Sequence, residues 1–144
     1  MKDWLWHLGT WLSLVLTNKV VLLTLGGAAG TNARYWLGRW CDEIAWARGF
    51  PLGTFIINVS GSFILGLAAT VILERWTPAA QHWYLLVGTG FCGGYTTFSA
   101  FSLETFTLLQ TGRPLAASAN VALSLMLCLA AIWIGYQAAA KLNT

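Results

Sequence analysis

The sequence predicts an all-α membrane protein with four transmembrane helices, the third of which is broken. Hydrophobic residues make up 57% of the 144 residues and charged residues only 9%, and the mean hydropathy is +0.64. A soluble domain carries roughly 25% charged residues, so this chain cannot cover a water-facing surface with its own charges. Charged residues divide the chain into four long apolar runs, and the third run contains poor helix formers.

The four expected spans lie between the charged residues. A helix needs about 20 mostly apolar residues to cross the core of a bilayer. Pro51, Pro78 and Pro114 stand near the starts of three runs, where a missing N–H costs little because the first N–H groups of a helix have no partner within it. We therefore expect spans at about residues 20–40, 52–73, 83–108 and 115–138, joined by short loops.

The first 18 residues form an N-terminal extension to a transmembrane domain at 19–144. Residues 4–16 are apolar but too short to span a bilayer,. A signal peptide is one interpretation, but the stretch ends in Thr17, Asn18 and Lys19 without a small-residue cleavage site,. We expect an interfacial helix that lies along the membrane, and a misassigned start is the alternative.

Several classes of function are excluded by what the chain lacks. The formal net charge is +3, but the basic residues form no run or stripe, so we expect no nucleic-acid partner. Cys41, Cys92 and Cys128 have no paired spacing, and His7 and His82 have no companion ligands,. No nucleophile stands near a base in the sequence. We therefore expect that the protein is not an enzyme.

The basic residues give almost no bias to the orientation of the chain. With four spans, both termini and the loop near residue 75 share one side of the membrane, and positive loops normally stay in the cytoplasm. A chain without this bias is expected to insert both ways and to pair as an antiparallel homodimer, although one decisive loop could instead impose a single orientation. The two sides carry Lys2, Lys19, Arg75 and Lys141, against Arg34, Arg39, Arg48 and Arg113.

Polar residues within the first two spans are candidate functional groups, because such residues are costly in hydrocarbon. Gly26 and Gly30 form a small-xxx-small pair that allows close helix approach,. Arg34 either snorkels to the headgroups as an anchor or provides a positive field that gathers anions,. Asn58, the only carboxamide of its run, either joins helices or donates its N–H₂ to a pathway.

The third span is the most informative. Gly-Gly followed closely by Thr-Thr, at 93–97 in mid-membrane, is poor helix material,. A break there frees backbone groups, which are tolerated only in buried or ion-lining positions, and freed carbonyls are good ligands for a hard cation. Beyond the break, Phe98 and Phe101 share one helix face. The polar residues Ser99, Ser102 and Glu104 follow on the same segment.

The fourth span carries Asn120, Ser124 and Cys128 at four-residue spacing, which makes one weakly polar stripe. The stripe is either ordinary small-residue packing or part of a pathway. The intramembrane inventory of amides, hydroxyls and aromatic rings suits conduction better than bond-making. Aromatic rings have a positive edge, so phenyl edges together with hydroxyl and amide donors can replace water around a small anion without trapping it.

At this point the sequence resembles the Fluc/CrcB family of fluoride channels. The resemblance covers about residues 20–140. It rests on GGxxGxxxRY at 26–35, GTFxxNxxG at 53–61 and above all on GTGFCGGYTTFSAFSLET at 88–105. Membership implies a dual-topology antiparallel homodimer in the cell membrane that conducts fluoride along two parallel pathways. It also implies a structural Na⁺ at the dimer centre, held by carbonyls of the broken third helices.

Matched residue by residue, the resemblance implies a role for each candidate. The Na⁺ ligands would be the backbone carbonyls of Gly93 and Thr96, and the vestibule arginine would be Arg34. One departure is Ala100, which stands where many relatives carry Thr. The fluoride pathway would be lined by Asn58, Phe98, Phe101, Ser99, Ser102, Glu104 and Ser124.

The function implied is passive export of fluoride that has entered the cell as HF. Two alternatives remain open on the sequence. A small multidrug-type exporter also has four spans and dual topology but needs an embedded carboxylate for proton coupling, and Glu104 is the only candidate. A membrane subunit without transport activity is the other alternative.

Overall fold

A computed structural model describes residues 17–43, 49–73 and 77–142, and every regular element in those ranges is helical. Residues 1–16 lie outside the described residues, so the interfacial helix expected there stays a prediction. The third expected span is a rod of three joined segments followed, after a break, by α6. In chain order the helices are α2 (Lys19–Asp42), α3 (Leu52–Leu73), α4 (Pro78–Trp83), η2 (Tyr84–Cys92), α5 (Gly93–Tyr95), α6 (Phe98–Gln110) and α7 (Pro114–Leu142).

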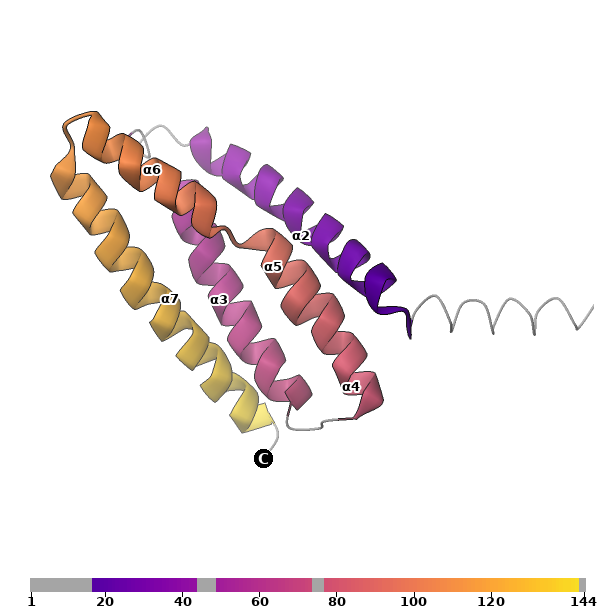
Figure 1. Cartoon of the computed structure of the whole chain (residues 1–144). Helices are drawn as coiled ribbons and strands as arrows, with labels where there is room; N and C mark the ends of the chain where they lie inside the picture. The colour runs from indigo at the N-terminus through magenta and orange to yellow at the C-terminus, as the bar shows by residue number, and fades with distance from the viewer. Residues whose placement is uncertain (1–16, 44–48, 74–76, 143–144) are drawn as a thin grey trace, which may run out of the picture.

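The helices run up and down through one bundle, with α3 at its centre (Figure 1). On one side α3 packs against α7, and on the other side it contacts α2 and η2. The α4–η2–α5 rod packs along α2, whereas α6 lies against α7. The ends of α3 and α7 and the start of α4 gather at one end of the bundle (Figure 1). This is the alternating arrangement expected for four successive spans.

Helix starts follow the signals in the sequence. The Asn18 side chain accepts from the Val20 N–H at 2.9 Å, and the Thr77 hydroxyl accepts from the Ala80 N–H at 3.1 Å,. Pro78 and Pro114 are the first residues of their helices,. The third segment therefore becomes helical at Pro78, five residues before the expected span at 83–108, because the cap and the proline together start a helix there.

Glycines bring α2 into backbone contact with the third segment. A Cβ on Gly26 would overlap the carbonyl oxygen of Leu86, and one on Gly30 would overlap that of Phe91. The small-xxx-small prediction for α2 is therefore confirmed, since any side chain at either position would push the helices apart. A similar contact joins α3 and α7, where it was not predicted: a Cβ on Gly66 would overlap the Ile132 carbonyl.

The predicted break in the third segment is confirmed, and it lies at Thr96 and Thr97. Both residues have extended backbone, with φ/ψ of −81°/160° and −154°/117°. Gly93 and Gly94, in contrast, remain helical. The β-branched threonines suit an extended conformation, whereas the bare backbone of Gly94 contacts α2: a Cβ there would lie 2.5 Å from the Gly27 carbonyl oxygen.

Within residues 17–43, 49–73 and 77–142, two helices are long and apolar enough to cross a bilayer. They cover Leu52–Ile72 and Pro114–Lys141, with mean hydropathies of 2.0 and 2.1, and only 28% and 22% of their most apolar stretches are buried within the chain. Such helices in a soluble protein would be buried. The other two expected spans differ from these helices. The third expected span is divided by its break, and α2 carries Arg34 and Arg39 within its length.

Candidate functional site

The break is held open by a side chain from a neighbouring helix. Asn58, on α3, donates from Nδ2 to the Thr97 carbonyl oxygen at 3.1 Å and accepts from the Thr97 N–H at its Oδ1 at 2.8 Å. One amide thereby satisfies both backbone groups of the extended residue. The interpretation of Asn58 as a group that joins helices is confirmed, while its role as a donor in a pathway stays a prediction.

This arrangement leaves the Gly93 carbonyl without its helical partner. In a continuous α-helix that carbonyl would accept from the Thr97 N–H, but this N–H is donated to Asn58. The Thr96 N–H is donated to the Cys92 carbonyl at 2.9 Å. Gly93 is exposed, and a Cβ on it would meet nothing within 4 Å. The Thr96 carbonyl faces the Arg34 guanidinium, whose Nη1 lies 3.5 Å away.

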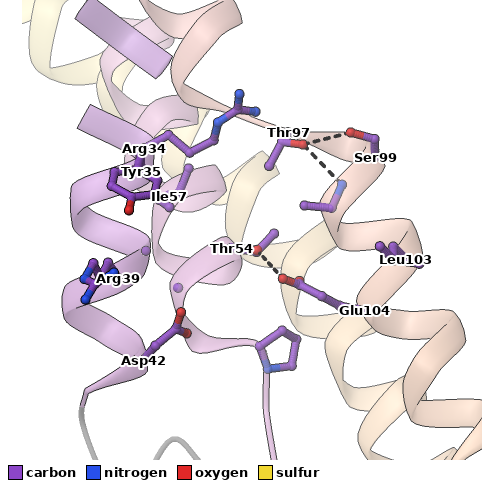
Figure 2. A pocket seen from close by; sticks show the side chains of 14 residues that line it. Arg34, Tyr35, Arg39, Asp42, Thr54, Ile57, Thr97, Ser99, Leu103 and Glu104 are labelled. Atoms are coloured by element: carbon purple, nitrogen blue, oxygen red, sulfur yellow. Dashed lines mark hydrogen bonds between the residues drawn. The ribbon is translucent and has the colours of Figure 1, made fainter. Parts of the chain in front are cut away.

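A first cavity of about 610 Å³, which we call the charged cavity, lies between α2, α3 and α6. Figure 2 shows Arg34 and Arg39 on its α2 side and Ser99 and Glu104 on its α6 side. The Thr54 hydroxyl donates to Glu104 Oε1 at 2.7 Å. Glu104 Oε2 is buried and, within the described part of the chain, makes no hydrogen bond.

A second cavity of about 480 Å³, which we call the phenyl cavity, lies between α3, α6 and α7. Phe98 and Phe101 line it with ring centroids 5.5 Å apart and ring planes tilted by 41°, so the expected shared face is confirmed. Polar residues line the cavity with the two rings, including Ser62, Thr96 and Thr97. The polar groups of the lining include the Asn58 amide and the Ser124 hydroxyl, and Cys128 also contributes.

Most of the site residues predicted from the sequence line one of the two cavities. Thr97 lines both, so the cavities meet at the break. Ser102 lines neither: it is exposed on α6 and donates to the Phe98 carbonyl at 2.9 Å. Gly93 also lies outside both cavities. The charged cavity contains Arg34, Ser99 and Glu104, and the phenyl cavity contains Asn58, Phe98, Phe101 and Ser124.

Thr54 is a lining residue that the sequence analysis did not single out. It lies one helical turn before Asn58, so the four-residue spacing within GTFxxN could have placed it on the same helix face,. Its partner Glu104 is 50 positions away in the sequence. Such a long-range pair leaves no trace in local spacing. Ala100 also lines the charged cavity, and its N–H donates to the Thr97 hydroxyl at 3.2 Å.

A family model described as "CrcB-like protein, Camphor Resistance (CrcB)" matches residues 21–136. This chain belongs to the CrcB family. The CrcB match begins within α2 and ends within α7, so it includes the break and both cavities. The extension at 1–18 lies outside it.

Curated relatives within the same family are named "Fluoride-specific ion channel FluC". The chain is 47% identical over 121 residues to the protein from Methylococcus capsulatus, covering 83% of this chain but only 52% of that longer relative. It is 44% identical over 116 residues to one from Coxiella burnetii, covering 81% of this chain and 93% of the relative. The protein from Rhodospirillum rubrum is 44% identical over 128 residues, covering 85% and 95%. These relatives are named as channels, not as enzymes.

Proposed function

We propose that this chain forms a fluoride-selective channel, through which fluoride leaves the cell down its gradient so that the cell is protected from fluoride toxicity. Membership of the CrcB family and the names of its relatives support this. The single observation that carries the proposal is the phenyl cavity, where two tilted rings meet an amide and a hydroxyl beside the break.

The phenyl cavity offers a small anion weak, uncharged interaction partners in place of water. The edges of Phe98 and Phe101 are electropositive, and the Ser124 hydroxyl and the second N–H of Asn58 are neutral donors. No Lys or Arg lines this cavity among the described residues. An anion is therefore held without the full positive charge that would trap it, which is the compromise that conduction requires.

The charged cavity supplies the approach to this site. Arg34 and Arg39 on its α2 side offer positive charge to an anion at its opening, and the carboxylates of Asp42 and Glu104 in the same lining offset part of that charge,. Ser99 and Glu104 then form a polar track along α6. The hydroxyl that Ala100 lacks is one fewer donor on this track, which lowers the expected rate of conduction rather than the selectivity.

We propose further that two chains pair as an antiparallel, dual-topology homodimer in the cell membrane, each chain crossing it several times. Phe98 is 79% exposed in the single chain, and Gly93, with its bare backbone, and the polar Ser102 are exposed on the same third segment. Polar backbone at membrane depth must be buried or must line an aqueous path. A second copy over this face would bury it, and the even distribution of basic residues is what two opposite orientations require.

A structural Na⁺ at the centre of that dimer is the third part of the proposal. The residues fit such an ion, because the Gly93 carbonyl lacks its helical partner and carbonyl oxygens are suitable ligands for a hard cation. The Thr96 carbonyl would be the second ligand from each chain, and Arg34 is its competitor at 3.5 Å. When bound, the ion would supply positive charge that joins the carbonyls of the two chains.

Fluoride efflux from liposomes tests the proposed function. Vesicles loaded with KF and containing the purified protein are expected to release fluoride to an electrode within seconds of adding a potassium ionophore, whereas protein-free vesicles retain it. KCl-loaded vesicles with the same protein should retain chloride. Chloride release as fast as fluoride release would exclude a selective channel.

Labelling in intact cells tests the dual topology. In a variant whose own cysteines are replaced, Gln110→Cys places one thiol at the exposed end of α6. A membrane-impermeant maleimide should label about half of the chains in intact cells and the remainder only after lysis. Labelling of all chains or of none in intact cells would mean a single orientation.

A further inference from the structure

A chain of hydrogen bonds links α6 to the serine that lines the phenyl cavity. The Thr105 hydroxyl donates to the Phe101 carbonyl at 2.7 Å and accepts from Asn120 Nδ2 at 2.9 Å. The Ser124 hydroxyl donates to Asn120 Oδ1 at 3.4 Å. Asn120 is only 1% exposed, and Ser124 is 7% exposed. The amide therefore lies behind the cavity wall, in contact with the serine but not with the cavity.

The number of hydroxyl and amide protons decides which group donates in each of these hydrogen bonds. A threonine hydroxyl has one proton, and Thr105 gives it to the Phe101 carbonyl. Thr105 can then only accept from Asn120, so the NH₂ end of the amide faces Thr105 and the oxygen end faces Ser124. The single hydroxyl proton of Ser124 is in consequence directed at Asn120 Oδ1.

The bond between Ser124 and Asn120 is weak. Its 3.4 Å is well beyond the usual 2.7–2.8 Å of an O–H···O bond,. Three other serines of these helices bond to carbonyls four residues back at shorter range: Ser60 to Ile56 at 2.7 Å, Ser62 to Asn58 at 2.8 Å and Ser102 to Phe98 at 2.9 Å. A serine in a helix makes this backbone bond readily. The bond directs the hydroxyl proton at the carbonyl of the preceding turn.

We propose that Asn120 is a positioning residue that keeps the Ser124 hydroxyl available as an exchangeable donor to an anion in the phenyl cavity. This inference rests on the proposed channel function. The long bond to Asn120 satisfies the hydroxyl while the cavity holds no anion. A charge-assisted hydrogen bond is roughly twice as strong as a neutral one, so the proton turns to an arriving fluoride and returns when the ion leaves. Asn120 itself does not touch the ion.

Without the amide, Ser124 is expected to bond to the carbonyl of residue 120, as Ser62 and Ser102 do to theirs. The variant Asn120→Leu, whose side chain has the same branching and the same number of heavy atoms, removes Oδ1. Fluoride efflux should fall about tenfold, the effect of losing one hydrogen bond to a charged group. Ser124→Ala should lower it by a similar factor. The double variant should be no slower than Ser124→Ala alone, because the first substitution acts through the serine.

Thr70→Val is the matched control. Thr70 is 6% exposed and bonds to the Gly66 carbonyl at 2.9 Å, so the change also removes a buried polar group, but one that lines neither cavity. Its fluoride efflux should equal that of the unsubstituted protein. Gel filtration and thermal unfolding monitor folding of every variant. Asn120→Ala serves as a second variant if Asn120→Leu fails to fold.

The outcomes separate the two levels of the proposal. If Asn120→Leu leaves efflux unchanged, or if its effect multiplies with that of Ser124→Ala, Asn120 has no role through the serine and the inference is overturned while the channel stands. If the unsubstituted protein releases no fluoride, the proposed function fails, and the inference fails with it. A loss of efflux that Ser124→Ala does not deepen supports the positioning role.

Discussion

At the scale of single residues, the proposed selectivity depends on the edges of two rings. Replacing Phe98 or Phe101 by Ile keeps an apolar side chain but removes the ring edge, which contributes about 1 kcal/mol to such a contact. Fluoride efflux should therefore fall about fivefold or more in either variant. Phe106→Ile is the matched control, since Phe106 is a partly exposed phenylalanine of α6 that lines neither cavity. A channel that tolerates isoleucine at both positions would not use ring edges.

A second prediction at this scale concerns Asn58. Asn58→Leu removes both bonds to Thr97 and leaves an N–H and a carbonyl unpaired, so we expect destabilisation of about 2–3 kcal/mol, measured by unfolding in detergent,. Asn32→Leu is the control, because Asn32 bonds only to Ala28 of its own helix among the contacts recorded. Its stability should change by less than about 0.5 kcal/mol. Equal stability of the two variants would contradict a stabilising role for the two bonds between Asn58 and Thr97.

Spacing within one segment allowed some of these residues to be predicted, and not others. Phe98 and Phe101 are three positions apart, so a helix after the break had to bring their rings together, and their centroids are 5.5 Å apart. The partners of Asn58 and Glu104 are 39 and 50 positions away. Those pairings arise from how α3 packs against the third segment, which no local pattern encodes.

At the scale of the elements, the contact between α2 and the third segment depends on bare backbone. Gly30→Ala would place a Cβ within 2.8 Å of the Tyr95 N and closer still to the Phe91 carbonyl. We expect destabilisation of about 1–3 kcal/mol, measured by thermal unfolding, because neither backbone can give way.

Gly27 is the matched position on the same helix. A Cβ there would meet only the Gly90 carbonyl, at 4.0 Å. Gly27→Ala should therefore be neutral or slightly stabilising, since alanine favours a helix more than glycine does. If Gly27→Ala and Gly30→Ala are equally harmful, the close approach of the two helices is not what these glycines provide.

The sequence predicted most element boundaries but not the form of the third segment. Pro114 predicted where α7 begins and poor helix formers predicted the break, but the third span was expected from residue 83, whereas α4 begins at Pro78. The π-helical stretch Tyr84–Cys92 was not predicted, because a wider turn has no signature in composition or spacing. The break lies at the threonines rather than the glycines because Gly94 contacts α2, a tertiary reason invisible in the segment itself.

At the scale of the whole molecule, the proposed Na⁺ site uses backbone carbonyls and no carboxylate. Glu104→Gln removes the only acid of the third segment beyond the break but preserves the acceptor for the Thr54 hydroxyl. The dimer should therefore remain intact, as measured by light scattering after gel filtration. Dissociation of Glu104→Gln into monomers would count against a site made of carbonyls alone.

The bond between Asn58 and Thr97 also has a consequence for how the protein is made. During synthesis α3 reaches the membrane before the third segment does, since chains emerge from the N-terminus onward. The amide of Asn58 therefore enters hydrocarbon about 39 residues ahead of the backbone that will satisfy it,. The amide gains its hydrogen-bond partners when the third segment arrives. The break at Thr97 therefore forms beside an α3 that is already present in the bilayer.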